Sequence, residues 1–297
     1  MDRLVTEPNF FIVGAPKSAT TNISYYLIQH PEIFMPEELE PYYFARHDVP
    51  KNYTREIISD KKKYLQIFKN NKNANFIGES SPVYLYCPQS AMDIKNQYPD
   101  AKIIISLRNP IEIVYSQYFS LKFMGFDNNS NFDAILKKDL ERISKNEFFI
   151  DSILEAGFYS KHIKRFQNLF PENQIKIIIF EEYVKNSIQE ISSILSFLGT
   201  KETVDFKDVP KNSFREPKNS FANAILKNSI LRKTSRRFIP SVTRSKIGEK
   251  FLVKESSRPK LEQNLRIRLQ KIYDEDVKEL EILLNRKLPW NDFNDQR

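Results

Sequence analysis

The 297-residue sequence is poor in three residue types that often carry structure or chemistry: it has 1 cysteine, 6 glycines and 3 histidines. One thiol, Cys87, cannot form an internal disulfide, which excludes a disulfide-stabilised fold and fits a reducing compartment. A metal site usually needs several clustered ligands. The histidines are far apart in the sequence, so we expect no metal site; they are His30, His47 and His162.

Long apolar runs are also missing. No stretch of about 18 consecutive apolar residues occurs, and we therefore expect no transmembrane segment. The N-terminal stretch MDRLVTEPNF lacks the apolar core and the small-residue cleavage site of a secretory signal peptide. Together these features predict a protein of the cytoplasm.

The residues that are present suffice for one sizeable core, since 40% are hydrophobic and 13% aromatic. We predict a single domain over residues 1–297, with an α/β core over 1–206 and a basic, mainly helical part over 207–297. The net charge is +8, but Lys207 to Lys271 alone holds 18 Lys/Arg against 5 Asp/Glu. Such a segment favours an anionic partner, namely nucleotide phosphates, an acidic glycan, a membrane surface or nucleic acid. A solvated helical face explains the charge equally well.

Strand and helix patterns alternate along the chain. Short apolar runs rich in β-branched residues predict buried strands at Phe10–Val13, Phe76–Gly78, Lys102–Leu107 and Ile175–Phe180. Helical spacing of apolar residues predicts helices at Thr21–Gln29, Pro110–Phe119, Tyr159–Phe170, Ile188–Leu198 and Leu261–Leu284. This order predicts an α/β fold with three layers, a central parallel sheet between helices. Ligands of such sheets bind at the carboxyl ends of the strands, here after the first and the third strand.

The loop after the first strand, in FFIVGAPKSATTNISYYL, has the composition of an anion site. Backbone N–H groups at the start of a helix attract anions, and Lys17, Thr20 and Thr21 add a charge and two hydroxyls. A P-loop NTPase would need a second glycine in a Gly-Lys-Ser/Thr sequence, and only Gly14 is present. The alternative is an ordinary helix start with Thr20 as N-cap and Lys17 in solvent.

A second candidate follows the strand in IIISLRNPIEIVYSQYFS. Arg108 stands at the carboxyl end of the strand, where a guanidinium can bind a phosphate through two hydrogen bonds. Pro110 fits the first turn of a helix, and Ser116 lies two turns further, where its hydroxyl could reach the same phosphate. The alternative is that Arg108 pairs with Glu112 and that Ser116 is a surface serine.

Two segments offer a carboxylate among apolar residues. In MPEELEPYYF, Glu40 precedes an aromatic run, where a raised pKa would suit a general base. The neighbouring Glu37 and Glu38 are expected in solvent. In FIGESSPVYLY, Glu79 is a second candidate that could line a substrate cleft, although a buried turn with capping serines is equally plausible. His47 is the alternative base.

Taken together, these segments resemble the sulfotransferases that use 3′-phosphoadenosine 5′-phosphosulfate (PAPS), above all the bacterial and the heparan-sulfate-type carbohydrate enzymes. The family's 5′-phosphosulfate loop, Pro/Arg-Lys-x-Gly-Thr-Thr, is similar to Pro16-Lys17-Ser18-Ala19-Thr20-Thr21. Its 3′-phosphate element resembles Arg108-Asn109-Pro110 with Tyr115-Ser116, and its Lys-Glu-Pro-x-x-Phe segment resembles Leu39-Glu40-Pro41-Tyr42-Tyr43-Phe44. Weaker similarities are Gly157-Phe158-Tyr159 and the C-terminal helices ending at Trp290.

The resemblance implies a P-loop-like fold and in-line transfer of a sulfuryl group from PAPS to a hydroxyl or amine, without a metal. The acceptor would be a carbohydrate, a lipid-linked glycan or a small molecule. Lys17 would stabilise the leaving 5′-phosphate and Glu40 would take the acceptor's proton. The remaining implied contacts are Pro16, Ser18, Ala19, Thr20, Thr21, Asn22, Arg108, Ser116, Arg215 and Lys218 for the nucleotide, and Tyr43 and Glu79 for the acceptor.

The sequence departs from the family pattern at two positions. Ala19 replaces the loop glycine and restricts the backbone near a phosphate, and Leu39 replaces a lysine before the proposed base. Two other functions remain open: a P-loop-type kinase or NTPase, and a non-catalytic module that binds nucleic acid or membrane through Lys207–Lys271. The sulfotransferase interpretation predicts no nucleic-acid partner.

Overall fold

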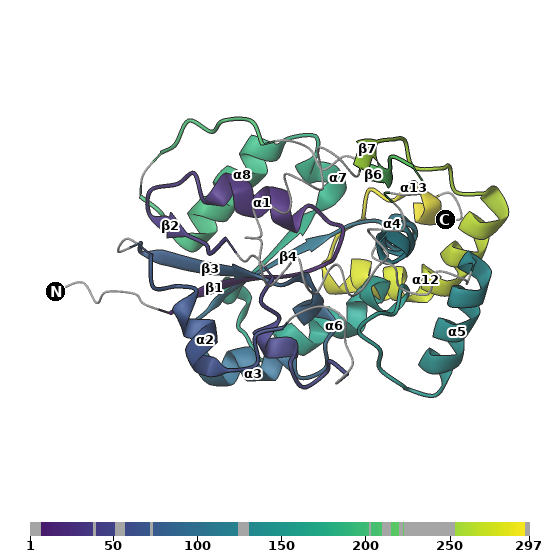
Figure 1. Ribbon diagram of the computed structural model, residues 1–297, viewed down its shortest axis with the longest axis horizontal. Helices are drawn as coiled ribbons and strands as arrows, with labels where there is room; N and C mark the ends of the chain where they lie inside the picture. The colour runs from purple at the N-terminus through teal and green to yellow at the C-terminus, as the bar shows by residue number, and fades with distance from the viewer. Residues whose placement is uncertain are drawn as a thin grey trace.

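A computed structural model describes residues 7–37, 40–50, 57–71, 74–123, 131–201, 203–209, 215–219, 222 and 253–294. Its centre is a five-stranded sheet in which all neighbouring strands are parallel and the order is β2-β3-β1-β4-β5 (Figure 1). The strands are β1 (Phe10–Gly14), β2 (Ile33–Phe34), β3 (Phe76–Ser80), β4 (Lys102–Leu107) and β5 (Ile175–Ile179). The predicted α/β architecture with a central parallel sheet is confirmed.

All the predicted strands form. The structure adds β2, which is only two residues long and therefore too short to be predicted from a sequence pattern. The α-helices are α1 (Thr20–Leu27), α2 (Lys61–Gln66), α3 (Ser90–Gln97), α4 (Pro110–Phe123), α5 (Phe132–Ser144), α6 (Tyr159–Gln167), α7 (Phe180–Tyr183), α8 (Ser187–Leu198), α12 (Gln263–Leu283) and α13 (Asn291–Asn294). Short 3₁₀ turns are η1 (Tyr43–Ala45), η2 (Pro82–Leu85), η3 (Glu155–Gly157) and η4 (Glu172–Gln174).

Side chains that alternate along the strands form a core on each face of the sheet. Phe10, Ile12 and Ile104 pack with α1 and α8 on one face, while Phe11 and Ile103 belong to the larger core on the other. Figure 1 shows α1 and α8 above the sheet and α2, α3 and α6 below it. These are the two helical layers that the strand–helix alternation predicted.

The strand order places the two candidate phosphate loops side by side. From β1 the chain continues to β2 and β3 on one side of the sheet, and then crosses to β4 on the other side of β1. β1 and β4 are hydrogen-bonded neighbours with Gly14 opposite Ile105, so the loops that follow them leave the same edge. A side chain at Gly14 would collide with Leu85, whose Cβ would lie 2.5 Å from the added atom. The loop therefore starts at a tight crossing that needs glycine.

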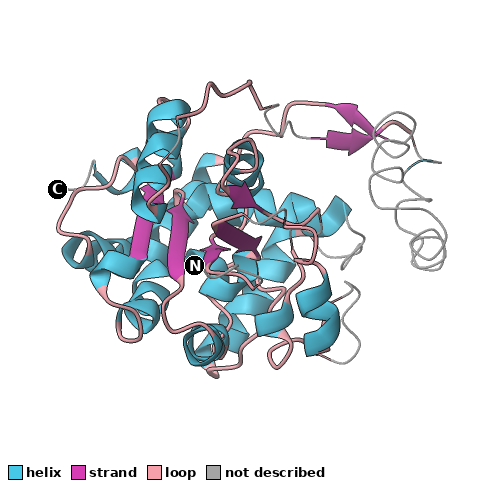
Figure 2. Ribbon diagram, turned by 90° about the vertical axis from the view of Figure 1, so that its left-hand side faces the viewer, coloured by secondary structure: helices cyan, strands magenta, loops and turns pink. Residues whose placement is uncertain are grey.

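The described C-terminal residues pack onto the larger core. Helix α12 contacts α6 and α4 and buries one face completely in this core, through Leu269, Tyr273, Val277 and Leu280. The single domain over residues 1–297 stays a prediction. Among the described residues of this part, which was predicted to be mainly helical, β6 (Arg215–Pro217) pairs antiparallel with β7 (Val253–Glu255). Figure 2 shows this strand pair standing apart from the central sheet.

No helix within the described ranges is both long and apolar enough to cross a bilayer. Most of the basic segment Lys207–Lys271 lies outside the described residues.

Candidate active site

The loop after β1 is held in an unusual backbone conformation. Lys17 and Ala19 both have φ of 64°, in the left-handed region that an L-residue enters at a cost of about 1–2 kcal/mol. Ala19 is the N-cap of α1 and provides no side-chain acceptor to its first turn, so the alternative with Thr20 as N-cap was wrong. At position 19 the family pattern has glycine, which adopts this left-handed conformation without the strain that alanine carries.

Ser106 of β4 holds this loop through two hydrogen bonds. Its carbonyl accepts a hydrogen bond from the Ala15 amide at 2.6 Å, and its hydroxyl donates to the Ser18 carbonyl at 2.6 Å. Ser18 is fully buried, and Asn22 accepts a hydrogen bond from the hydroxyl of Tyr183. These predicted nucleotide contacts therefore have side chains that face the protein. Two other residues of this loop that were predicted to contact the nucleotide, Pro16 and Thr20, are buried as well.

Arg108 reaches from the neighbouring loop to the Lys17 backbone. Its Nη1 donates to the Lys17 carbonyl at 3.0 Å, its guanidinium lies 4.4 Å from the ring centre of Phe180, and its own carbonyl accepts from Tyr159 at 2.7 Å. The Nε atom of Arg108 is buried, and no described residue accepts a hydrogen bond from it. A donor left over in this way fits an anionic ligand better than a purely structural arginine.

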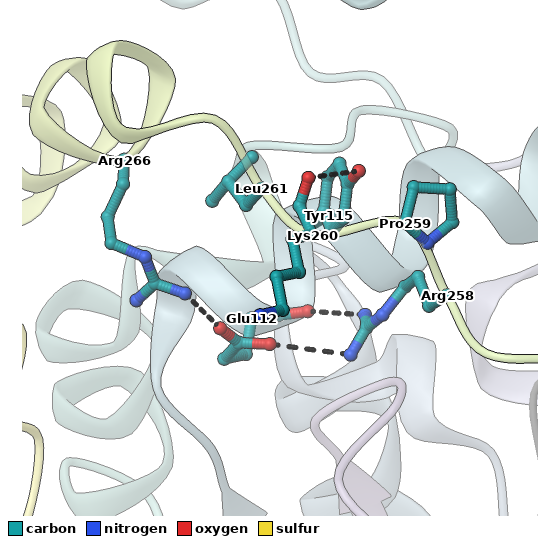
Figure 3. A pocket seen from close by; sticks show the side chains of 7 residues that line it. All are labelled: Glu112, Tyr115, Arg258, Pro259, Lys260, Leu261 and Arg266. Carbon is teal, nitrogen blue, oxygen red and sulfur yellow. Dashed lines mark hydrogen bonds and ion pairs between the residues drawn. The ribbon is translucent and has the colours of Figure 1, made fainter.

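Three arginines share the carboxylate of Glu112, which lies in the first turn of α4. Arg266 lies 2.6 Å from it, Arg258 lies 3.3 Å from it, and Arg108 makes a longer contact of 3.9 Å. The predicted alternative, an ion pair of Arg108 with Glu112, thus exists, but Glu112 together with Asp292, which binds Arg266, cannot neutralise three guanidinium groups. Figure 3 shows Glu112 between Arg258 and Arg266 at the base of a cavity of about 380 Å³. The cavity is lined by Glu112, Tyr115, Arg258, Pro259, Lys260, Leu261 and Arg266.

Arg258 and Lys260 are two cationic site residues that the sequence did not single out. The cationic C-terminal contribution was expected from Arg215 and Lys218, which belong to the segment of β6. Because β6 pairs with β7, and β7 leads within three residues to Arg258, the two segments are neighbours. The surplus of positive charge was the available signal, but only the packing of the chain shows which of its residues reaches α4.

Charges from three parts of the chain converge on Lys17. Burial lowers the pKa of Lys17, although part of the side chain is exposed, and the charge of Glu40 raises it. The charges of Arg108 and Arg258 lower it further. The structure thus brings together the predicted residues Lys17, Arg108 and Glu40, and adds Arg258. A cluster of cations that repel one another is the arrangement expected of an anion site.

The C-terminal residues hold the Arg108 loop in place. Asn109 donates to Asp292 of α13 at 2.7 Å, and its amide donates to Glu181 at 3.0 Å. Glu181 also accepts from the indole of Trp290 at 2.9 Å, and Asp292 binds Arg266 at 2.7 Å. These carboxylates were missed because nothing in their local sequence distinguishes them from surface acids.

Glu40 is close enough to Lys17 for its charge to act there, and Tyr43 begins η1 three residues later. Glu40 is half-buried and accepts a hydrogen bond from the Tyr42 hydroxyl at 3.1 Å. Tyr43 is only 5% exposed and stacks on Tyr64 with 4.2 Å between ring centres, which leaves little of it for an acceptor. His47, the alternative base, is exposed and lies 4.0 Å from Asp93 of α3. Of the two candidate bases, Glu40 is the one whose charge acts on Lys17.

Glu79 was expected to line a substrate cleft, and the structure does not place it there. Its side chain is fully buried on β3, where it accepts hydrogen bonds from Tyr64 at 2.5 Å and Ser81 at 2.7 Å. The segment F-I-G-E-S is a strand whose last side chains turn into the core, which the apolar residues around Glu79 could not distinguish from a cleft wall. The alternative of a buried turn describes this position better.

The burial of Glu79 predicts a pH-dependent stability. Burial raises the pKa of Glu79 from 4.5 to about 7, with hydrogen bonds from Tyr64, Tyr84 and Ser81 opposing the rise. The stabilisation of the folded state by protonated Glu79 is fully present below pH 4.5 and is lost as the pH rises through 7. The loss of unfolding free energy amounts to about 3 kcal/mol. We therefore expect the difference in unfolding free energy, Glu79→Gln minus wild type, to increase by about 3 kcal/mol when the pH is raised from 4.5 to 8. Urea titrations at the two pH values measure it.

The difference between the two proteins is the quantity to measure, because another buried group titrates nearby. Burial lowers the pKa of His162 from 6.5 to about 3, so its contribution is lost as the pH falls below 6.5. That effect has the opposite sign and is common to both proteins. A constant difference in unfolding free energy across this range would show that Glu79 titrates normally.

The other predicted contacts are placed less fully. Ser116 is half-buried on α4, one turn after Glu112, on the helix that lines the cavity. Lys218 is exposed next to β6, and Arg215 is the first residue of that strand. Within the described ranges no group of three or more His, Cys, Asp or Glu side chains has an arrangement that could hold a metal ion.

Comparison with known proteins gives the family. The model of the sulfotransferase domain matches residues 7–281. The chain belongs to the sulfotransferase family. A crystal structure of a sulfotransferase from Alicyclobacillus acidocaldarius is 28% identical and superposes with a TM-score of 0.70 over 96% of this chain and 98% of that one. The P-loop-like fold of this sulfotransferase and the suspected resemblance are thereby confirmed.

Two characterised relatives are similar over part of the sequence. The membrane-associated sulfotransferase kil1 of Dictyostelium discoideum is 33% identical over 123 residues, which is 41% of this sulfotransferase and 25% of the relative. The human bifunctional heparan sulfate N-deacetylase/N-sulfotransferase 2 is 28% identical over 206 residues, 67% of this chain and 22% of the relative. This sulfotransferase spans about a quarter of the length of these relatives.

Proposed function

We propose that this sulfotransferase uses PAPS as its donor and transfers the sulfuryl group to a hydroxyl or amine of a carbohydrate or glycolipid. The observation that carries the donor assignment is the convergence of Lys17 and Arg108 from the loops after β1 and β4, with Arg258 beside them. The two neighbouring loops can hold the two ends of a bisphosphorylated nucleotide. The buried Nε of Arg108 and the shared Glu112 support an anionic ligand at that end.

The residues divide between the two ends of the donor. The amides of the loop, with Lys17, Thr20 and Thr21, would hold the 5′-phosphosulfate at the start of α1. Arg108 and Arg258 would hold the 3′-phosphate, with Ser116 on the same helix as Glu112. The 3′-phosphate distinguishes PAPS from ATP, so these arginines would set the choice of donor.

Transfer then breaks one bond and forms another at sulfur. The acceptor oxygen or nitrogen attacks the sulfur while the bond to the oxygen that bridges to the 5′-phosphate breaks. The electron pair of that bond stays with 3′-phosphoadenosine 5′-phosphate, whose charge Lys17 stabilises, and the acceptor's proton passes to Glu40. As in phosphoryl transfer, the protein contributes mainly position and charge.

The acceptor is proposed from chemistry and similarity. The heparan sulfate relative is named for N-sulfotransferase activity, which supports a sugar amine as well as a hydroxyl. The assay is transfer from ³⁵S-labelled PAPS to a panel of de-N-sulfated heparin, N-acetylated heparosan and a glycolipid extract. Label on a saccharide or glycolipid supports this acceptor class. Label only on small phenols or alcohols would contradict it. Action in the cytoplasm stays a prediction.

Binding of the product nucleotide tests the donor site without an acceptor. We expect micromolar binding of 3′-phosphoadenosine 5′-phosphate by isothermal titration, and a loss of at least about tenfold in Arg108→Ala and in Arg258→Ala, since a charged hydrogen bond is worth about 1.5 kcal/mol or more. Arg268→Ala is the matched control, because Arg268 is on α12 but pairs with Asp133 in solvent. Its affinity should stay within about twofold of the wild type.

ATP with Mg²⁺ is the competing ligand in the same titration. The kinase alternative predicts a Mg²⁺-binding aspartate at the end of a strand, whereas β4 is followed by Arg108, and the family is that of sulfotransferases. Binding of ATP without binding of the bisphosphate would contradict the proposed donor. Equal affinity of wild type and Arg108→Ala for the bisphosphate would leave the donor open and remove Arg108 from the site.

A further inference from the structure

The segment that carries Glu40 depends on a strained residue. Tyr42 has φ of 56° and ψ of 23°, a left-handed conformation that is unfavourable for an aromatic residue. In this conformation its hydroxyl donates to Glu40 at 3.1 Å. Strain of this kind persists only where surrounding contacts enforce it. The relevant question is which contacts hold Tyr42.

Two hydroxyls hold this segment by its backbone. The Tyr42 amide donates to the hydroxyl of Ser81 at 3.2 Å, and the Phe44 amide donates to the hydroxyl of Tyr84 at 3.1 Å. Both hydroxyls come from the end of β3 and from η2, and both are buried. The backbone around Tyr42 is therefore bound to side chains of a different part of the chain.

Both hydroxyls lie next to Glu79. Ser81 donates to one of its oxygens at 2.7 Å and Tyr64 donates to the other at 2.5 Å, while the Tyr84 hydroxyl is near enough to lower the pKa of Glu79. Above pH 7, where Glu79 is ionised, its oxygens can only accept, so the hydroxyls of Ser81 and Tyr64 direct their protons to it. The oxygens of Ser81 and Tyr84 are then left to accept from the Tyr42 and Phe44 amides.

We propose that Glu79 is a positioning residue, which acts through Ser81 and Tyr84 to hold Tyr42–Phe44 so that Glu40 faces the acceptor. This inference rests on the proposed role of Glu40 as the base. It also gives a reason for a buried carboxylate, which costs stability and would otherwise be replaced by an apolar side chain. Nothing in the inference requires Glu79 to touch a substrate.

Glu79→Gln is the discriminating variant. It keeps the shape, but its amide donates, so one of the hydroxyls loses its acceptor and turns its proton toward a loop amide. We expect the Tyr42 and Phe44 amides to exchange with deuterium at least about tenfold faster, because about 1.4 kcal/mol or more of local protection is lost. Binding of 3′-phosphoadenosine 5′-phosphate should stay within twofold of the wild type. On the best acceptor of the panel, kcat should fall at least tenfold.

Asp139→Asn is the matched control. Asp139 is also a buried acid, and it holds a different loop by accepting from Ser152, Ile153 and Leu154. Its replacement should speed exchange at Ile153 and Leu154 and leave Tyr42, Phe44 and kcat unchanged. This separates a general loss of stability from the loss of one orientation. Ser81→Ala provides a second variant, with exchange faster at Tyr42 than at Phe44.

A double variant ties the effect to Glu40. In a Glu40→Gln background, Glu79→Gln should lower transfer by less than twofold, because the group that it positions is gone. A further tenfold loss there, or weaker nucleotide binding, would show a general structural role and overturn the inference. Unchanged exchange at Tyr42 and Phe44 would overturn it whether or not any acceptor is sulfated. Full activity of Glu40→Gln alone would instead remove the proposed base, and with it this role of Glu79.

Discussion

Replacing Glu40 by glutamine is expected to lower kcat for sulfuryl transfer by about 100-fold to 10,000-fold, the usual contribution of a general base. Glutamine keeps the size of the side chain and can still accept from the Tyr42 hydroxyl, which lies 3.1 Å from Glu40. What it loses is the capacity to take the acceptor's proton. The measurement is the initial rate with ³⁵S-labelled PAPS and the best acceptor of the panel, at saturating donor.

Two controls make the result specific. Glu37→Gln removes a carboxylate from the same segment, but Glu37 is exposed, and its kcat should stay within about twofold of the wild type. His47→Gln should likewise have little effect, because His47 lies toward Asp93. A large loss in His47→Gln with activity retained in Glu40→Gln would exchange the two assignments.

Lys17→Ala is the second variant with a large expected effect. An ammonium that meets charge developing on the leaving phosphate is worth about 100-fold to 1,000-fold in kcat, by analogy with one oxyanion donor. The backbone of the loop should survive, since the Lys17 carbonyl still accepts from Arg108. We therefore expect nucleotide binding to weaken much less than kcat, when titration and initial rates are compared on the same preparation.

Lys62→Ala is the corresponding control, because Lys62 is an exposed lysine on α2. It should match the wild type in both measurements. If Lys17→Ala lost binding and kcat by the same factor, Lys17 would serve mainly to bind the donor. If it lost neither, the loop after β1 would not be the site of the 5′-phosphosulfate.

The main architecture could be predicted because buried parallel strands have a strong local signature. Lys102–Leu107 was bounded correctly, since it is a continuous apolar run closed by Arg108 and Pro110. The strand β6 was missed because Arg215–Pro217 is polar and forms only through its pairing with β7. α5 (Phe132–Ser144) was missed as well, although its buried residues Phe132, Ile135, Leu136 and Asp139 follow the spacing of a helix.

The site could be predicted only where chemistry coincides with a strand end. Lys17 and Arg108 each follow a strand, so a parallel sheet brings them together whatever the rest of the chain does. Arg258 and Asp292 are distant in sequence and have no local pattern, and their places depend on how α12 and α13 pack. The prediction that Glu79 lines a cleft was wrong, because the sequence around an acid at a cleft wall does not differ from that around an acid buried in a core.

The link between Asn109 and Asp292 also bears on the order in which the chain is made. The two residues are 183 positions apart, and ribosomes add about 5–20 residues per second, so Asp292 follows Asn109 by about 10–40 seconds. Until then Glu181 lacks its partner Trp290, and Glu112 lacks both Arg258 and Arg266. The growing chain thus carries the Arg108 loop before the residues that tie it to the C-terminal helices exist. The network around Asn109, Glu112 and Glu181 is therefore complete only after α13 has been made.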